Sequence, residues 1–453
     1  MARIDTEAWE ATNRQRLDDQ VEMVRRDNAV GVTVRSTRGE EDLTILTVPN
    51  TVIVEGEGRD EKLEALKAFV ESPKSPFVKG GKPTKRDKTV IDQITVFELP
   101  RLKGRRGEKE DSADVVLQEP TLKDVARPEY YIHVSADHGR PCPATEPEET
   151  GLRDPWPPFD PTSTAGQGVV VTVVDTGWWQ TAARHPWLAQ DVGGDPEPIG
   201  ANLHAYSGHG TFIAGIVRCR APKAVIRHER FKVQRRKRGQ AYADYEASVR
   251  ESAIIRQLKE ALDKHVGDER PHIINLSAGT YTLDDQELST LTAVGNVIRN
   301  LPNTVLIAAA GNDSTDVPFY PAASGWAVGV GSLDRQGGVS NFSNFGPNAN
   351  VYALGRNHVN AFPDGVYRCR ETPDKEDRRV FTPQSGLARW SGTSFAAPLV
   401  AGLIAAELSE NGGTAKAAAR TVLNSVQRRQ VRLRPAPLPP YPYGKIKRLH
   451  PNF

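Results

Sequence analysis

The chain lacks the features that mark a membrane-spanning, exported or disulfide-stabilised protein. Its 453 residues contain three cysteines and no run of about eighteen apolar residues. Cys142, Cys219 and Cys369 are odd in number and far apart, which excludes a disulfide framework and a zinc site of the usual spacing. The N-terminal twenty residues lack the apolar core of a secretory signal. We therefore expect a cytoplasmic protein, unless a non-classical route exports it.

The chain also lacks a charge excess. Lys and Arg number 59 and Asp and Glu 57, so the net charge is only +2. Nucleic-acid binders usually carry a strong basic excess. We expect neither a nucleic-acid partner nor a membrane partner.

What the chain does contain divides it into four segments. Residues 1–137 mix helical and strand patterns. The expected helices are a polar one at 1–27 and a further one at 59–72. The expected strands are 43–48 and 51–56, joined by a turn at Pro49 and Asn50, and two more at 88–99 and 129–136. This pattern predicts a small N-terminal α+β domain. Residues 138–165 are rich in proline and acidic residues, which indicates a linker.

The third segment, residues 166–430, alternates short apolar runs with helical patterns. The runs are 169–174, 272–277, 304–310, 326–331 and 350–355, and the helices are expected at 211–217, 245–265, 285–299, 395–408 and 415–426. Such alternation predicts an α/β fold, a parallel sheet with helices on both faces. Residues 431–453 are proline-rich and are expected to form an extended tail.

Four polar residues should gather at one edge of this sheet. Asp175 and Asn312 directly follow apolar runs, so they lie at the carboxyl ends of strands, where ligands of open parallel sheets bind. His209 and Ser394 begin helices, which start at the same edge. Each of the four residues taken singly also fits a helix cap, a turn or a buried polar group. All four at one edge favours catalysis instead.

The four residue types suit acyl transfer. Serine is a weak nucleophile that needs a base, histidine is a base near neutral pH, and a carboxylate fixes the imidazole tautomer. The backbone N–H of Ser394 and the side-chain amide of Asn312 are candidate donors to an oxyanion. The sequence thus predicts Asp175, His209, Ser394 and Asn312 as catalytic residues.

Around these residues the chain resembles the subtilisin-like serine proteases, or subtilases. The matching motifs are Asp175-Thr-Gly, His209-Gly-Thr-x-x-Ala-Gly, Ala-Ala-Gly-Asn312 and Gly-Thr-Ser394-x-Ala-Ala-Pro, over about residues 166–430. Their order, Asp then His then Ser, is that of the subtilisin triad. The resemblance implies a subtilisin-like fold and a serine endopeptidase acting on polypeptides.

The resemblance also implies how substrate binds. Subtilases take the substrate as an added strand, and here Ser277, Ala278 and Gly279 would form one wall of the pocket for the residue before the cut. Residues 308–311 would form the other wall, and Phe319 would form the floor. Because family members often have a small residue there, we expect a shallow pocket for small side chains.

Several features depart from the family pattern or stay open. Phe212 replaces a second, non-catalytic histidine, and the calcium loop of secreted relatives is missing, so we expect no metal and no cofactor. The basic run at 235–238 fits either a solvated loop or a selector of acidic residues upstream of the cut. The insertion at 366–387 fits either a surface loop or a lid.

The role of residues 1–137 is open as well. Subtilases often carry an α+β prosegment that caps the cleft and is cut off, and self-cleavage in the linker would fit that role. A permanent targeting or sensing domain is the other reading. For the whole chain we weigh an endopeptidase, latent until this domain is cut or displaced, against a catalytically silent scaffold that binds peptides.

Overall fold

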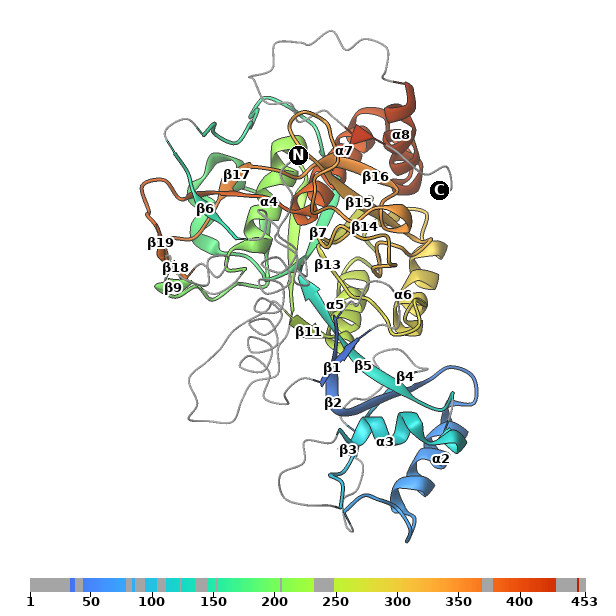
Figure 1. Cartoon of the computed structure of the whole chain (residues 1–453). Coiled ribbons are helices and arrows are strands. Elements are labelled where there is room, and N and C mark those ends of the chain that lie inside the picture. The colour runs from blue at the N-terminus through green and yellow to red at the C-terminus, as the bar shows by residue number, and fades with distance from the viewer. Residues whose placement is uncertain are drawn as a thin grey trace, which may run out of the picture.

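The described residues form two large sheets, one mainly parallel and one antiparallel, and two three-stranded sheets; strand β5 of the antiparallel sheet extends toward the parallel one (Figure 1). The computed structural model describes residues 33–36, 44–78, 84–85, 94–103, 111–122, 124–134, 146–151, 154–203, 206–231, 248–368, 378–428 and 446–447. The predicted fold class is confirmed: helices cover both faces of the parallel sheet, and a smaller α+β region precedes it.

The larger sheet has the strand order β21-β16-β15-β14-β12-β7-β10-β8. Its strands are β7 (Val170–Asp175), β8 (Val192–Gly194), β10 (Val225–Arg230), β12 (His272–Leu276), β14 (Thr304–Ala309), β15 (Ala327–Leu333), β16 (Val351–Leu354) and β21 (Ile446–Lys447). All pair in parallel except β21, which lies antiparallel to β16 within the predicted tail.

Helices bury both faces of this sheet. One face packs on α4 (His209–Arg220), α7 (Thr393–Asn411) and α8 (Ala415–Arg428), and the other on α5 (Glu251–Asp263) and α6 (Ser289–Asn300). Strand β14 is apolar throughout because both of its faces are buried. Val305 and Ile307 join the core under α7, while Leu306 and Ala308 join the core under α6, because successive side chains point to opposite faces.

Two predicted helices begin later than their patterns suggested. Helix α6 starts at Ser289 rather than at residue 285, because Asp285 has a positive φ of 56°, outside the helical region. Helix α5 starts at Glu251, directly after the short strand β11 (Ser248–Arg250). Apolar periodicity runs on into such flanking segments, so it sets helix boundaries poorly.

The smaller sheet holds β1 (Thr33–Ser36), β2 (Thr44–Glu55), β3 (Thr84–Lys85), β4 (Ile94–Glu98) and β5 (Arg127–Val134). Helices α2 (Arg59–Glu71) and α3 (Ser112–Gln118) accompany it. The predicted hairpin at 43–56 is wrong, because β2 is one strand. Asn50 takes a left-handed φ of 54° and the pairing with β5 shifts register between Thr47 and Val52, so Pro49 and Asn50 form an irregularity rather than a turn.

The predictions for the other segments have mixed outcomes. Helix α3, capped by the Asp111 side chain, was not predicted. The expected helix at 1–27 lies outside the described residues. Within the predicted linker, β6 (Glu148–Glu149) pairs with β20 (Leu387–Trp390), which also pairs with β17 (His358–Ala361).

The insertion at 366–387 has described flanks. They form strands β18 (Gly365–Arg368) and β19 (Arg378–Phe381), an antiparallel pair beside β9 (Asn202–Leu203). Residues 369–377, with Cys369, lie outside the described residues, as does Cys142. Cys219 is a buried free thiol.

Candidate active site

The edge of the parallel sheet brings Asp175 and His209 into contact. Asp175 is the last residue of β7 and His209 the first residue of α4. Nδ1 of His209 lies 2.8 Å from Oδ1 of Asp175, and both side chains are buried. The same oxygen accepts from the backbone N–H of Thr176 at 2.8 Å, which fixes the carboxylate. This geometry can hold the imidazole in one tautomer.

Close backbone packing makes that contact possible. A Cβ at Gly210 would lie 2.7 Å from the carbonyl oxygen of Gly177, so only glycine lets α4 start this near the end of β7. The N–H of Gly210 also donates to Oγ1 of Thr176 at 3.0 Å. The turn after β7 is thus bonded to the residue that directly follows His209.

Ser394 is the second residue of α7 and is buried at the same edge. Its hydroxyl makes no hydrogen bond to any described residue. The ring of His209 packs on Phe395, the next residue, with centroids 5.4 Å apart. Triad hydrogen bonds are often loose without substrate, so this arrangement is compatible with transfer of the serine proton to His209.

The backbone around Ser394 is braced through its carbonyl. Pro398 has no N–H, so the carbonyl of Ser394 lacks its usual helical donor. Oγ of Ser277 donates to this carbonyl at 3.1 Å instead. Oγ of Ser277 in turn accepts from Nδ2 of Asn275 at 3.0 Å. The nucleophile turn is therefore bonded directly to the predicted pocket wall.

Asn312 lies beyond the end of β14 with its amide oriented by Thr393. Its Oδ1 accepts from the N–H and the hydroxyl of Thr393, each at 3.0 Å. The N–H of Gly311 donates to the same hydroxyl at 3.2 Å. Because Oδ1 is held this way, the NH₂ group is the end of the amide left to meet a developing anion. Thr393 was not predicted as a site residue, although it stands inside the Gly-Thr-Ser motif.

Comparison with protein-family models matches residues 166–437 to the subtilase family. The chain belongs to the subtilase family. Among curated relatives, M-protease of Shouchella clausii is 26% identical over 254 residues, covering 54% of this chain and 55% of that protein. Thermitase of Thermoactinomyces vulgaris is 30% identical over 267 residues, covering 55% and 78%. The chain thus spans about half the length of M-protease.

A solved structure resembles the chain beyond the matched segment. Fervidolysin from Fervidobacterium pennivorans, described as a keratinolytic enzyme related to subtilisin, superposes with a TM-score of 0.52 at 18% identity. The likeness covers 84% of this chain and 57% of fervidolysin. At this identity it shows the fold alone, and its extent includes more than residues 166–437.

In this subtilase, strand β5 of the smaller sheet lies between the predicted pocket wall at residues 277–279 and strand β11. It pairs antiparallel with β11 (Val249 opposite Ile132) and with β13 (Ala278–Gly279), whose Gly279 is opposite His133. Figure 1 shows β5 leaving the smaller sheet toward the larger one. Antiparallel pairing with β13 directs β5 toward Ser277, the residue bonded to Ser394. An extended strand therefore already lies where a substrate strand was expected.

Ion pairs and hydrogen bonds to the buried carboxylates of Glu251 and Glu129 hold β5 in this position. The Arg127 guanidinium bonds both carboxylate oxygens of Glu251, at 2.6 and 2.8 Å, and also the carboxylate of Glu55. Glu129 accepts from the N–H of Ser252 at 3.3 Å, at the start of α5. Removing one partner of a buried pair typically costs about 3–5 kcal/mol. Strand β5 is thus anchored to the subtilase domain, not merely adjacent to it.

Phe319 lies against the predicted pocket walls. Its buried ring leaves no space for a protein side chain at position 279 or 311. A Cβ at Gly279 would lie 2.4 Å from the ring, and a Cβ at Gly311 would lie 3.2 Å from it. The ring also packs on Tyr281, with centroids 5.0 Å apart. The structure thus brings Phe319 together with both walls.

Glu197 is a further carboxylate beside Asp175 that sequence reasoning missed. It accepts from the N–H of Gly208 at 2.9 Å and from the hydroxyl of Thr176 at 3.1 Å. Burial is the main cause that raises the pKa of Glu197 to about 8; the nearby Asp175 charge also raises it, while these hydrogen bonds and Arg230 lower it. No motif contains Glu197, so only the fold reveals it.

The raised pKa makes stability depend on pH. Folded Glu197 holds its proton up to about pH 8, whereas an unfolded glutamate releases it near pH 4.3. Stability should therefore fall as pH rises between these values. Because glutamine cannot ionise, we expect the free energy of unfolding of Glu197→Gln to fall less over that pH range than that of its parent. Denaturant unfolding at pH 5 and pH 8.5, in a Ser394→Ala background, measures this.

The exposed carboxyl of Glu71 on α2 provides the control. Glu71→Gln should leave the difference between the two pH values as in the parent. Equal pH dependence in the parent and Glu197→Gln would contradict the assignment.

The remaining predictions concern the basic run, membrane-spanning helices and metal sites. The basic run at 235–238 lies outside the described residues, and β11 follows it. No helix in the described part of the chain combines the length and apolar character that crossing a bilayer requires. Nowhere in the described ranges do three or more His, Cys, Asp or Glu side chains gather as a metal site would require.

Proposed function

We propose that this subtilase is a serine endopeptidase in which Ser394, His209 and Asp175 act as a triad. The observation that carries the proposal is the 2.8 Å contact of His209 with a buried carboxylate at the edge where α7 begins with Thr393 and Ser394. Family membership supports the reaction class.

The proposed mechanism has two halves. Nε2 of His209 takes the proton from the Ser394 hydroxyl as Oγ attacks the peptide carbonyl, and then gives that proton to the departing amine. A water molecule, deprotonated by the same nitrogen, then attacks the acyl carbonyl, and Nε2 returns the proton to Oγ of Ser394 as the C–O bond breaks and the carboxylic acid product leaves. Asp175 stays ionised and stabilises the imidazolium formed in each half.

The oxyanion of each tetrahedral intermediate accepts from two donors. These are the backbone N–H of Ser394, at the N-terminus of α7, and the Asn312 amide. The hydrogen bonds from Thr393 support this role because they orient the amide before substrate arrives.

Substrate binds as a strand between β11 and β13. Main-chain bonds to these edges supply affinity, and side-chain pockets supply selectivity. Because the Phe319 ring fills the space between Gly279 and Gly311, the pocket before the cut takes small side chains. Ser277, Ala278 and Gly279 line it.

Strand β5 makes the full-length chain latent. It takes the substrate's place between β11 and β13, so a peptide cannot enter until β5 is cut free or displaced. At its end, β5 runs along β13 toward Ser277, which is bonded to Ser394, and the next residue in the sequence, Ser135, is small. We place self-cleavage directly after β5, within residues 135–145.

Intact mass after purification tests latency and self-cleavage together. The wild type should yield two fragments, with the new N-terminus within residues 135–145, and Ser394→Ala should remain a single chain of 453 residues. Identical fragments from both proteins would show that another protease cuts the chain. An uncut wild type that hydrolyses peptides at once would overturn latency while leaving the endopeptidase proposal standing.

A further inference from the structure

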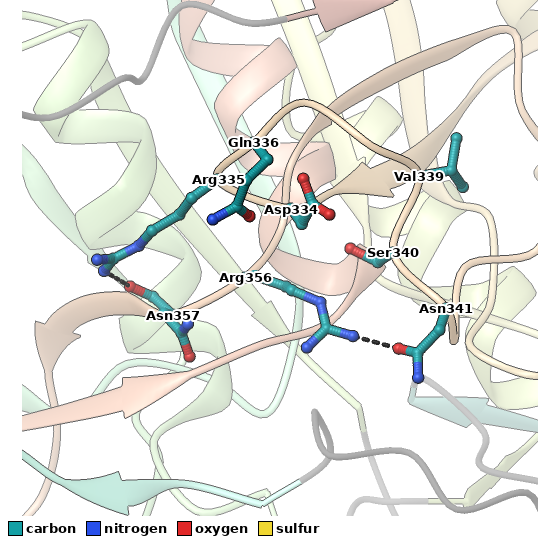
Figure 2. Close-up of a pocket in the computed structure, with 8 residues that line it drawn as sticks. All are labelled: Asp334, Arg335, Gln336, Val339, Ser340, Asn341, Arg356 and Asn357. Carbon is teal, nitrogen blue, oxygen red and sulfur yellow. Dashed lines mark hydrogen bonds between the residues drawn. The ribbon is translucent and has the colours of Figure 1, made fainter. Parts of the chain in front are cut away.

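A polar pocket with a volume of about 370 Å³ opens beyond the carboxyl ends of β15 and β16. Figure 2 shows its lining side chains, which come from the turn after β15 and the loop after β16. The lining residues are Asp334, Arg335, Gln336, Val339, Ser340, Asn341, Arg356 and Asn357.

Two guanidinium groups face this pocket against one carboxylate. Arg356 stacks over the Phe342 ring at 4.9 Å and donates to the side-chain oxygen of Asn341. Arg335 donates to the backbone oxygen of Asn357 at 3.3 Å. Asp334 is bonded within its own turn, accepting from the N–H of Gly338 at 2.8 Å. A guanidinium has five donors, so Arg356 can keep its bond to Asn341 and still bind a carboxylate.

The pocket is bonded directly to the nucleophile turn. The N–H of Gly392 donates to the oxygen of Gly355 at 2.8 Å, and the N–H of Asn357 donates to Oγ of Ser391 at 2.9 Å. Ser391 precedes Ser394 by three residues, so their Cα atoms lie within about 11 Å. A peptide held at Ser394 can reach this pocket within a few residues.

The sheet order indicates which part of the peptide arrives there. Strand β13, the edge that binds the acyl side, follows β12, while the pocket follows β15 and β16. Strand β14, with Asn312 at its end, lies between them. A substrate strand that runs along β13 to Ser394 therefore meets the pocket with residues that follow the cut bond.

We propose that the Arg335–Arg356 pocket selects substrates with an acidic side chain shortly after the cut bond, an inference that rests on the proteolytic function proposed above. The first ten residues after β5 contain a single acidic residue, Asp137. A cut between Val134 and Asp137, the part of that window nearest β5, places Asp137 on the leaving-group side. The segment of this chain that follows the proposed cut thus carries the acidic side chain that the pocket would select.

Quenched fluorescent peptides with the sequence of residues 128–142 test this. They carry Asp, Asn or Lys at position 137, and a second set moves the Asp to the first, second or third residue after the cut. We expect kcat/KM for the Asp peptide to exceed the Asn peptide about tenfold in 50 mM salt, as one charge-assisted bond provides. The ratio should shrink in 1 M salt, because the pocket is open to solvent.

Variants separate a local effect from damage to the fold. Arg356→Gln and Arg335→Gln should each lower the Asp/Asn ratio while keeping turnover of the Asn peptide, and Arg335→Glu should shift preference toward Lys, which misfolding cannot do. Arg299→Gln, at an exposed arginine on α6, is the matched control. Equal rates for Asp, Asn and Lys peptides would overturn this inference alone. No cleavage of any peptide, even after β5 is released, would overturn the endopeptidase with it.

Discussion

Ser394→Ala is expected to lower kcat for a peptide substrate by about 10⁶-fold. Without Oγ there is no acyl-enzyme, and the base and oxyanion donors retain only their small effect on direct attack by water. This magnitude is the loss measured for the nucleophile of subtilisin itself, so it is carried over from a relative. Initial rates on the processed enzyme measure it, with the variant freed of residues 1–134 by an inserted cleavage site.

Ser391→Ala provides a neighbouring control. Ser391 binds the N–H of Asn357 rather than the triad, so its loss should cost less than tenfold in kcat with a standard peptide lacking acidic residues. Ser394→Ala protein that keeps even a thousandth of wild-type turnover would contradict the nucleophile assignment.

Asp175→Asn is expected to lower kcat by about 10⁴-fold. The Asn amide would donate to Nδ1 of His209, which places the ring proton on Nε2, where it cannot accept from Ser394. The buried site would also lose the negative charge that stabilises the imidazolium. Progress curves over pH 6–10 measure the effect, and KM should change little because Asp175 does not touch substrate.

A second aspartate separates this effect from a change in net charge. Asp284 is exposed in the loop before α6, so Asp284→Asn should keep wild-type kcat. An Asp175→Asn enzyme within tenfold of wild type would mean that the 2.8 Å contact of Asp175 with His209 is structural only.

The sequence predicted the sheet and its edge well because both follow from local rules. Apolar runs such as 304–310 are too short for helices and must be buried on both faces, and a polar residue that directly follows one lies at the strand end. The structure has the four predicted residues at this edge: Asp175, Asn312, His209 and Ser394.

Other features depend on contacts between distant residues, and no pattern in the sequence announces them. Glu197 becomes part of the site only because the loop after β8 returns beside the turn that follows β7. The place of β5 between β11 and β13 is set by pairings between residues more than a hundred positions apart. Likewise, the local sequence at Pro49 and Asn50 is typical of a hairpin turn, but pairing with β5 on both sides of it makes β2 one continuous strand.

The most direct measurement of the central claim is covalent labelling by a fluorophosphonate followed by peptide mapping. The account predicts one modified residue, Ser394, in wild-type protein whose β5 has been released, with labelling abolished in Ser394→Ala and strongly slowed in His209→Ala. Folded, released protein in which Ser394 stays unmodified would contradict the triad and leave a subtilase scaffold that binds peptides without cutting them.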